Sequence, residues 1–237
     1  TFFIGATLGC ATALPGYFPA MKAVCERHGA LLILDEVMSG MGRSGTLHAW
    51  EQEGITPDIQ VIAKGLGGGY QPIGGILVHG RVIEALAKGS GTFKHGHTYQ
   101  AHPVACAAAL AVQEVIRDEK LLDNAKAMGA LLEQRLIERL GNHARIGDIR
   151  GRGLFWAVEL VQDRASKAVF DPALAVNDRV KKEAFARGLA CYPMGGTIDG
   201  KHGDHVILAP PYIVTAEDVA MIVERFGDAV EAAIAGL

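Results

Sequence analysis

The sequence predicts an α/β protein, because short segments that are apolar throughout alternate with helical stretches. Residues 31–35 (Leu-Leu-Ile-Leu-Asp) and residues 59–63 (Ile-Gln-Val-Ile-Ala) are too short for helices, and each is apolar at all positions but one. Such segments are typical of strands covered on both faces, as in a parallel sheet. A third segment, residues 75–78, is predicted to be another strand of this kind. The first half of the chain is therefore expected to contain a parallel sheet with helices around it.

Helices are predicted between and after these strands. Residues 19–28 form an amphipathic pattern that ends at Gly29, a typical C-terminal cap. A short helix is expected over residues 82–87. The alanine-rich stretch 102–117 is apolar nearly all round, so a buried helix is predicted there, with Pro103 in its first turn.

The second half of the chain is predicted to be a smaller α+β domain, residues 121–237, which follows a first domain of residues 1–120. It opens with a long amphipathic helix over residues 121–140. Thr215 and Asp218 form a capping-box-like pair at the start of the last helix. The remaining predicted elements are a turn over 148–153, a strand over 154–160, a helix over 173–187 and a strand over 205–209.

Composition excludes several classes of protein. A net charge of −3 over 237 residues gives no electrostatic case for nucleic-acid binding. No apolar run approaches the roughly 20 residues of a membrane span. The four cysteines are scattered, which is typical of reduced thiols in a cytoplasmic protein.

The chain begins at Thr1 within apolar sequence, so we expect it to be the C-terminal portion of a longer protein.

Asp35 and Lys64 are the candidate site, because each ends a predicted buried strand. Ligands of open α/β sheets lie at the carboxyl ends of strands. Partial burial would lower the pKa of the Lys64 amine toward a nucleophilic form, although a solvent-exposed lysine is the commoner case. The Asp35 carboxylate needs a partner to offset its burial. That partner is either Lys64 or a protonated ring nitrogen of a cofactor.

An apolar strand that ends in Asp-Glu also resembles the Walker B strand of nucleotide hydrolases. That interpretation requires a phosphate loop of the form Gly-x-x-x-x-Gly-Lys-Ser/Thr. The nearest match is the stretch from Gly195 to His202, which has histidine in place of the hydroxyl residue and precedes a strand rather than a helix. We therefore set the nucleotide-hydrolase interpretation aside.

A histidine cluster at His95, His97 and His102 raises the alternative of a metal site. No partner carboxylates are evident, and the segment instead offers Gly96, the Thr98 hydroxyl and a helix start. This combination better suits an anion held by N–H groups and a hydroxyl. A helix-entry loop with ordinary surface histidines remains the simpler alternative.

These motifs together resemble the class III aminotransferases, which are pyridoxal-phosphate enzymes of fold type I and include the ω-aminotransferases. The resemblance covers essentially the whole chain. The segments that carry it are residues 32–37 (Leu-Ile-Leu-Asp-Glu-Val), 42–45 (Gly-Arg-Ser-Gly), 57–58 (Pro-Asp), 63–74 (Ala-Lys-Gly-Leu-Gly-Gly-Gly-Tyr-Gln-Pro-Ile-Gly), 96–99 (Gly-His-Thr-Tyr), 151–154 (Gly-Arg-Gly-Leu) and 209–211 (Ala-Pro-Pro).

The resemblance implies a role for each matching residue. Lys64 would bind pyridoxal 5'-phosphate as a Schiff base and later move a proton between substrate and cofactor. Asp35 would pair with the protonated pyridine nitrogen, and Val37 would pack on one ring face. Thr98 would donate to the cofactor phosphate of the partner subunit, which implies a homodimer with a shared active site. The reaction would be a ping-pong transfer from an amine or amino acid donor to a keto-acid acceptor.

The chain departs from the family pattern in three ways. Met38 stands where many relatives have a glutamine that contacts the ring hydroxyl. Leu208 stands where relatives that bind α-carboxylates often have arginine, which favours an amine or ω-amino acid donor. The upstream phosphate cup and ring-stacking aromatic residue are absent from these 237 residues, so we expect them to bind the cofactor poorly alone. The sequence leaves open whether Arg43, Arg150 or Arg152 reaches a ligand.

Two other functions fit the same residues. A pyridoxal-phosphate aminomutase or racemase of the same fold would share Asp35 and Lys64. A non-catalytic relative could act only as a dimerising partner, although an intact Asp35, Lys64 and Thr98 argue against lost chemistry.

Overall fold

The computed structural model describes residues 2–3 and 9–237, which fall into two compact units. The first unit contains Ala13–Gly42 and Thr46–Leu122, together with strand β1 (Phe2–Phe3). The second contains residues 9–12, Arg43–Gly45 and Asp123–Leu237. Each unit has its own four-stranded sheet.

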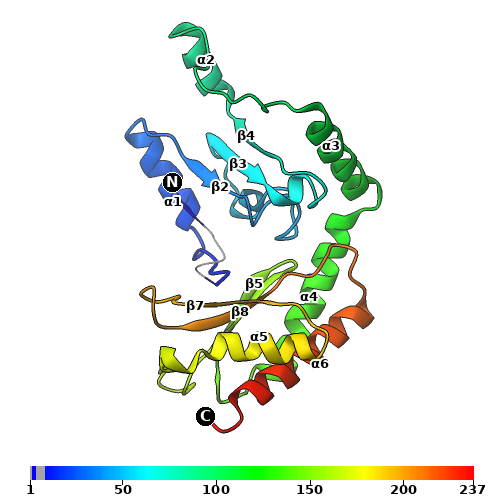
Figure 1. The fold of residues 1–237 in the computed structure, drawn as a ribbon. Coiled ribbons are helices and arrows are strands. Elements are labelled where there is room, and N and C mark those ends of the chain that lie inside the picture. The colour runs from blue at the N-terminus through cyan, green and yellow to red at the C-terminus, as the bar shows by residue number, and fades with distance from the viewer. Residues whose placement is uncertain (1, 4–8) are drawn as a thin grey trace. The chain divides into compact units, whose positions relative to one another are not determined.

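The first unit is built around the sheet β1-β2-β3-β4, which is drawn in blue to cyan in Figure 1. Phe18 on the first helix packs against Leu32, Leu34 and Ile55 to form its apolar core. The elements that follow β1 are α1 (Tyr17–Arg27), β2 (Ile33–Asp35), the 3-10 helix η2 (Ala49–Glu53), β3 (Ile59–Ala63), the 3-10 helix η3 (Lys64–Leu66), β4 (Gly74–Val78), α2 (Gly80–Lys88) and α3 (Pro103–Asp118).

The predicted parallel pairing is confirmed for β2 and β3 and wrong for β4. Strands β1, β2 and β3 pair in parallel, whereas β4 runs antiparallel to β3, with Ala63 opposite Gly74. A parallel connection requires a crossover of about a dozen residues or more. The segment between Ala63 and Gly74 is too short for one, so the chain turns back along β3.

Helix α3 forms where it was predicted, but its predicted burial is wrong for the described residues. Only Ala105, Ala109 and Ile116 are buried on this helix. Val104 and Leu110 are 59% and 61% exposed. The apolar residues of α3 therefore form a wide surface that no described part of the chain covers.

The second unit packs three helices onto one face of an antiparallel sheet with strand order β5-β6-β8-β7 (Figure 1). The long helix α4 (Leu121–Leu140) has the predicted bounds. The remaining elements are β5 (Ile146–Arg152), β6 (Phe155–Leu160), the 3-10 helix η4 (Pro172–Leu174), α5 (Val176–Ala186), β7 (Tyr192–Gly195), β8 (Asp204–Leu208) and α6 (Ala216–Ile234).

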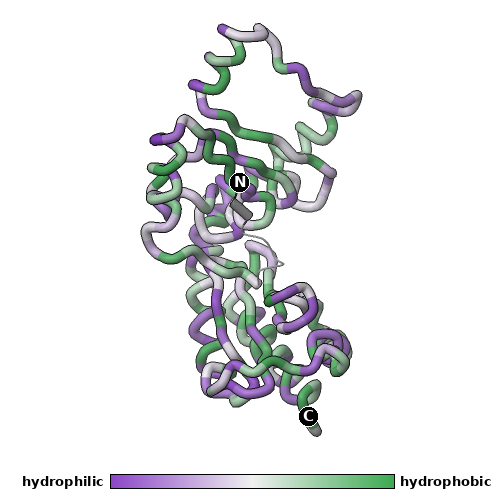
Figure 2. Tube along the Cα trace, turned by 90° about the vertical axis from the view of Figure 1, so that its left-hand side faces the viewer, coloured by the Kyte–Doolittle hydropathy of each residue, from purple (hydrophilic) through white to green (hydrophobic). Residues whose placement is uncertain are grey.

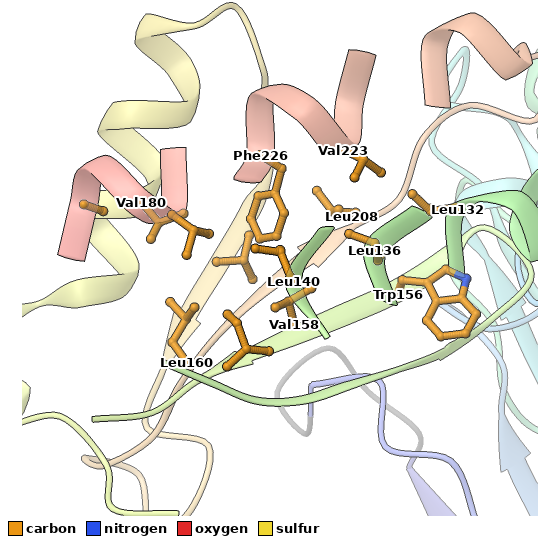
Figure 3. Packing of buried hydrophobic residues seen from close by; sticks show 14 of the residues in the cluster. Leu132, Leu136, Leu140, Trp156, Val158, Leu160, Val180, Leu208, Val223 and Phe226 are labelled. Carbon is orange, nitrogen blue, oxygen red and sulfur yellow. The ribbon is translucent and has the colours of Figure 1, made fainter. Parts of the chain in front are cut away.

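The core of the second unit lies between that sheet and the helices (Figure 3). Leucines four positions apart on α4 lie on one face of the helix, as expected of a buried stripe. In Figure 2 the helices of this unit alternate between hydrophilic and hydrophobic residues along the trace. The buried residues labelled in Figure 3 are Leu132, Leu136, Leu140, Trp156, Val158, Leu160, Val180, Leu208, Val223 and Phe226.

Two strands of this sheet differ from the sequence prediction. Residues 148–153 were predicted as a turn but belong mostly to β5, and β7 was not predicted at all. Asp148, Arg150 and Arg152 interrupt any apolar pattern in β5, and Arg150 is stabilised there by ion pairs with Asp148 and Glu159. Strand β7 contains Pro193 and lies at the sheet edge, where a proline is tolerated.

The capping box at the last helix is confirmed. The Thr215 hydroxyl accepts a hydrogen bond from the Asp218 N–H at 3.2 Å, and the Asp218 carboxylate accepts from the Thr215 N–H at 3.0 Å. No helix among the described residues is long and apolar enough to cross a membrane.

Candidate active site

Asp35 lies at the carboxyl end of β2, directly beside β3. It is paired in the parallel register with Val61, and its side chain is half-buried. One carboxylate oxygen, Oδ1, accepts a hydrogen bond from the Val37 N–H at 3.0 Å. This bond curls the chain after the strand and holds the carboxylate at the strand end. Oδ2 forms no hydrogen bond with any residue that the structure describes, so it can accept one from a ligand.

Lys64 follows β3 immediately, so the acid and the amine come from adjacent ends of neighbouring parallel strands. The side chain is exposed in this structure, which differs from the predicted partial burial. Nothing in the described chain covers it. Both residues are described, and no ion pair joins Lys64 to Asp35.

The backbone around Lys64 is held in an unusual conformation. Lys64 has φ of 45°, in the left-handed region that non-glycine residues rarely adopt. The Lys64 carbonyl accepts from the Gly67 N–H at 3.1 Å, and Gln113 of α3 donates to the Leu66 carbonyl at 3.1 Å. A Cβ on Gly67 would lie only 2.7 Å from the Gln71 carbonyl oxygen. The lysine therefore projects from a tightly folded, well-anchored turn.

Thr98 lies in the segment between α2 and α3, and its side chain is exposed. No hydrogen bond joins it to Asp35, Val37 or Lys64, all of which the structure describes. His102 caps helix α3, where its Nδ1 accepts from the Ala105 N–H at 3.4 Å. Among the described residues, no group of histidine, cysteine, aspartate or glutamate side chains could hold a metal ion.

Glu36 is a buried acid that the sequence prediction did not single out. It is 3% exposed, and its two carboxylate oxygens accept from the Ala49 N–H, the Trp50 N–H and the Gln60 amide at 2.7–2.8 Å. Burial raises the pKa of this carboxyl, and the two backbone N–H groups act against that shift. The only signal in the sequence was a second carboxylate directly after Asp35.

The arginines left open by the sequence have structural partners in the second unit. Arg43 donates to the Leu154 carbonyl at 3.0 Å and to the Pro210 carbonyl at 2.6 Å. Arg150 donates to the Gly9 carbonyl at 2.7 Å, besides its ion pairs. Arg152 is half-buried in β5.

The stretch from Gly195 to His202 forms the turn between β7 and β8, two antiparallel strands. It opens no helix, which a phosphate loop would require. The Asp199 carboxylate accepts hydrogen bonds from the Lys201 and His202 N–H groups at 2.9 and 2.8 Å and pairs with the His202 ring. This turn is therefore stabilised by its own side chains and is not a nucleotide site.

Comparison with known proteins identifies the family. The family model for class III aminotransferases matches residues 4–230. The chain belongs to this family. An uncharacterised aminotransferase of Schizosaccharomyces pombe is 51% identical over 98% of the chain and 51% of its own length. The chain therefore spans about half the length of the curated relatives it matches.

Solved transaminase structures share the fold. A thermostable (S)-enantioselective ω-transaminase from Thermomicrobium roseum is 37% identical, with a TM-score of 0.87 over 95% of this chain and 48% of its own. An amine transaminase from an uncultivated Pseudomonas species, in a pyridoxal-phosphate-bound form, is 38% identical, with a TM-score of 0.82 over 93% and 48%. The fold is thus that of the fold type I transaminases, and membership of the family implies pyridoxal phosphate as cofactor.

Proposed function

We propose that the protein transfers an amino group from an amine or amino acid to a keto acid, with Lys64 holding pyridoxal phosphate as a Schiff base. The observation that supports this most is the placement of Asp35 and Lys64. They follow adjacent parallel strands within the motifs of a class III aminotransferase and form no ion pair with each other.

The residues of the first unit fit the cofactor. When bound, pyridoxal phosphate supplies an aldehyde and an electron-withdrawing ring. The Asp35 Oδ2 would accept from the protonated ring nitrogen, while Oδ1 stays fixed by the Val37 N–H. The half-buried Val37 side chain would pack on the ring. Thr98, exposed before α3, would donate its hydroxyl to a phosphate held by a second copy of the chain.

Lys64 would serve both as the covalent attachment point and as the general base. Its side chain is exposed and unpaired with any described carboxylate, so the amine can leave its attachment point and return. Once an amino donor had taken its place, the free Lys64 amine would take a proton from the substrate carbon and act as the general acid that returns it. Two such half-reactions, with donor and then acceptor, constitute a ping-pong cycle.

We propose an amine or ω-amino acid as donor. Leu208 is 2% exposed and apolar at the position where many relatives have arginine before Ala-Pro-Pro, so it offers no charge to an α-carboxylate. A panel of amine, ω-amino acid and α-amino acid donors tests this choice. Strong preference for α-amino acids would contradict it.

The working unit in this proposal is a homodimer in the cytoplasm. The exposed apolar residues of α3 support an interface, because large exposed apolar surfaces mark contacts with other chains. The division after Leu122 supports a cofactor-binding domain over residues 1–120 and a smaller domain over residues 121–237. The four free cysteines are compatible with a reducing compartment.

The experiment that tests the function uses the full-length protein with pyridoxal phosphate, an amine donor and a keto-acid acceptor. Wild-type protein is expected to release more than one equivalent of carbonyl product per site only with acceptor present, and Lys64→Ala is expected to release none. Turnover without acceptor would instead indicate an aminomutase or racemase. Absence of any cofactor absorbance would leave only the non-catalytic, dimerising role.

A further inference from the structure

A buried network lies directly behind Asp35, on the opposite side of the same strand end. Glu36 follows Asp35, and its N–H donates to the Val61 carbonyl at 3.0 Å, so the parallel pairing continues one peptide beyond β2. Successive residues of an extended chain point to opposite faces. Asp35 is accordingly half-exposed on one side, while Glu36 is buried on the other.

Every polar atom of the Gln60 side chain is used in this network. Its amide nitrogen donates to Glu36 Oε2 at 2.8 Å and contacts His48 Nδ1 at 2.9 Å, while its oxygen accepts from the Trp50 indole at 2.9 Å. Since the amide nitrogen is a donor, His48 Nδ1 must be the acceptor, which requires a neutral imidazole. The His48 ring stacks on the Trp50 ring, with 5.4 Å between the two ring centroids.

A carboxylate suits the Glu36 position, because every hydrogen bond that its side chain makes with the described residues comes from a donor. The Ala49 and Trp50 N–H groups point at its two oxygens, together with the Gln60 amide. A glutamine at this position would turn an NH₂ group against one of these donors. Fully connected buried networks fix a single arrangement, whereas partly satisfied ones lose it.

The main chain of Glu36 is held as firmly as its side chain. Its carbonyl accepts from the Gly40 N–H at 2.9 Å, and a Cβ on Gly40 would lie 2.9 Å from that carbonyl oxygen and 3.0 Å from Oε2. The turn after β2 is therefore folded directly onto Glu36. With its side chain and both main-chain groups bonded, Glu36 fixes the peptide that joins it to Asp35.

The same network connects the two strands of the candidate site. Gln60 lies on β3, opposite Leu34 in the register, and β3 leads to Lys64. Its bond to Glu36 therefore ties the end of the Asp35 strand to the Lys64 strand on their buried side. Loosening this bond would change both the direction of Asp35 and its separation from Lys64.

We propose that Glu36 is a positioning residue, held by Gln60, His48 and Trp50, which sets the Asp35 carboxylate against the cofactor ring. This inference rests on the proposed function, in which Asp35 pairs with the ring nitrogen. Glu36 touches neither cofactor nor substrate. Its effect on cofactor affinity must therefore pass through Asp35, whereas a general loss of stability would act whether or not Asp35 is present.

A double-mutant cycle separates these cases, with the dissociation constant for pyridoxal phosphate measured on the full-length protein by spectral titration. Glu36→Gln is expected to raise this constant about tenfold in the wild-type background and less than about twofold in the Asp35→Asn background. Equal effects in both backgrounds, or no effect in either, would overturn the inference. Wild-type protein that binds no cofactor would overturn the proposed function itself.

A matched control lies at the other end of the same strands. Asp58 is a buried carboxylate that accepts from the Leu32 N–H at 2.8 Å and pairs with Arg81 at 2.7 Å. Asp58→Asn is expected to lower thermal stability and leave cofactor affinity unchanged. If Glu36→Gln does not fold, Trp50→Phe removes the indole donor to Gln60 and keeps an aromatic ring beside His48, and the same non-additivity with Asp35→Asn is expected at smaller size. Additive effects would again overturn the inference.

Discussion

Arg43 stacks on Tyr212, with the guanidinium carbon 4.7 Å from the ring centroid. The same guanidinium donates to the carbonyls of Leu154 and Pro210. Burial lowers the pKa of Arg43 and raises the pKa of the Tyr212 phenol, and each group opposes the shift of the other. Three of the segments that resemble the class III family thus meet at one arginine within the second unit.

Replacement of Arg43 is expected to destabilise this unit. Arg43→Lys keeps the charge but loses the planar fork that reaches two carbonyls and stacks on a ring. The free energy of unfolding, measured by urea denaturation, is expected to fall by about 1–3 kcal/mol. Arg225→Lys is the control, because that half-buried side chain donates one 3.1 Å bond to the Gly188 carbonyl. Equal losses for the two variants would contradict the role given to Arg43.

The turn after Lys64 is expected to require glycine at position 67. A Cβ there would lie 2.7 Å from the Gln71 carbonyl oxygen and 2.8 Å from Ile73 Cγ2. Gly67→Ala must therefore shift the turn that orients Lys64, and weaker pyridoxal-phosphate binding is expected in spectral titration of the full-length protein. Gly80→Ala is the control, because a Cβ at that helical position meets nothing within 4 Å. Unchanged affinity in Gly67→Ala would contradict the account of this turn.

The turn between β7 and β8 is expected to depend on the ionised Asp199. Hydrogen bonds from the His202 N–H and ring and from the Lys201 N–H lower its pKa to about 2. Because the folded pKa lies below the ordinary value of 3.8, the stabilisation is complete above pH 3.8 and is lost as pH falls through about 2.

Carboxyl chemical shifts followed by NMR over this range check the Asp199 prediction. His202→Ala removes the ring that pairs with the Asp199 carboxylate. The midpoint of the Asp199 titration is expected to move upward, toward 3.8. A wild-type midpoint at 3.8, or one unmoved by His202→Ala, would contradict the hydrogen bonds assigned to Asp199.

Cys10 is expected to be an inert thiol. It is 3% exposed, and burial raises its pKa to about 12 against the smaller opposing effect of Arg150. Iodoacetamide reacts with thiolates, so native protein at pH 8 is expected to remain unmodified at Cys10, while urea-unfolded protein is alkylated there. Peptide mass spectrometry distinguishes the two. Rapid native alkylation of Cys10 would contradict its burial.

The sequence was sufficient for the elements whose pattern reflects local packing. The bounds of α4 and the capping box of Thr215 with Asp218 were predicted as found. The direction of β4 was predicted wrongly from its apolar character, which does not distinguish a parallel from an antiparallel partner. The short segment between Ala63 and Gly74 was the signal for the antiparallel direction. The charged residues of β5 concealed a strand, since their ion pairs form only with residues brought close by folding.

The candidate site was predictable in part for the same reason. Asp35 and Lys64 each end an apolar strand, which the sequence displays directly. The role of Glu36 depends on Gln60 and on the N–H groups of Ala49 and Trp50, which reach it only in the folded unit. The exposure of Lys64 and of helix α3 was not predictable, because an apolar pattern indicates burial without identifying the chain that provides it.

The most direct test of the account is the covalent attachment of cofactor to Lys64. Full-length protein is incubated with pyridoxal phosphate, reduced with borohydride, digested and analysed by peptide mass spectrometry. We expect a phosphopyridoxyl group on the peptide that contains Lys64 and no such label at that position in Lys64→Ala. Label confined to another lysine, or no label in wild-type protein, would contradict it.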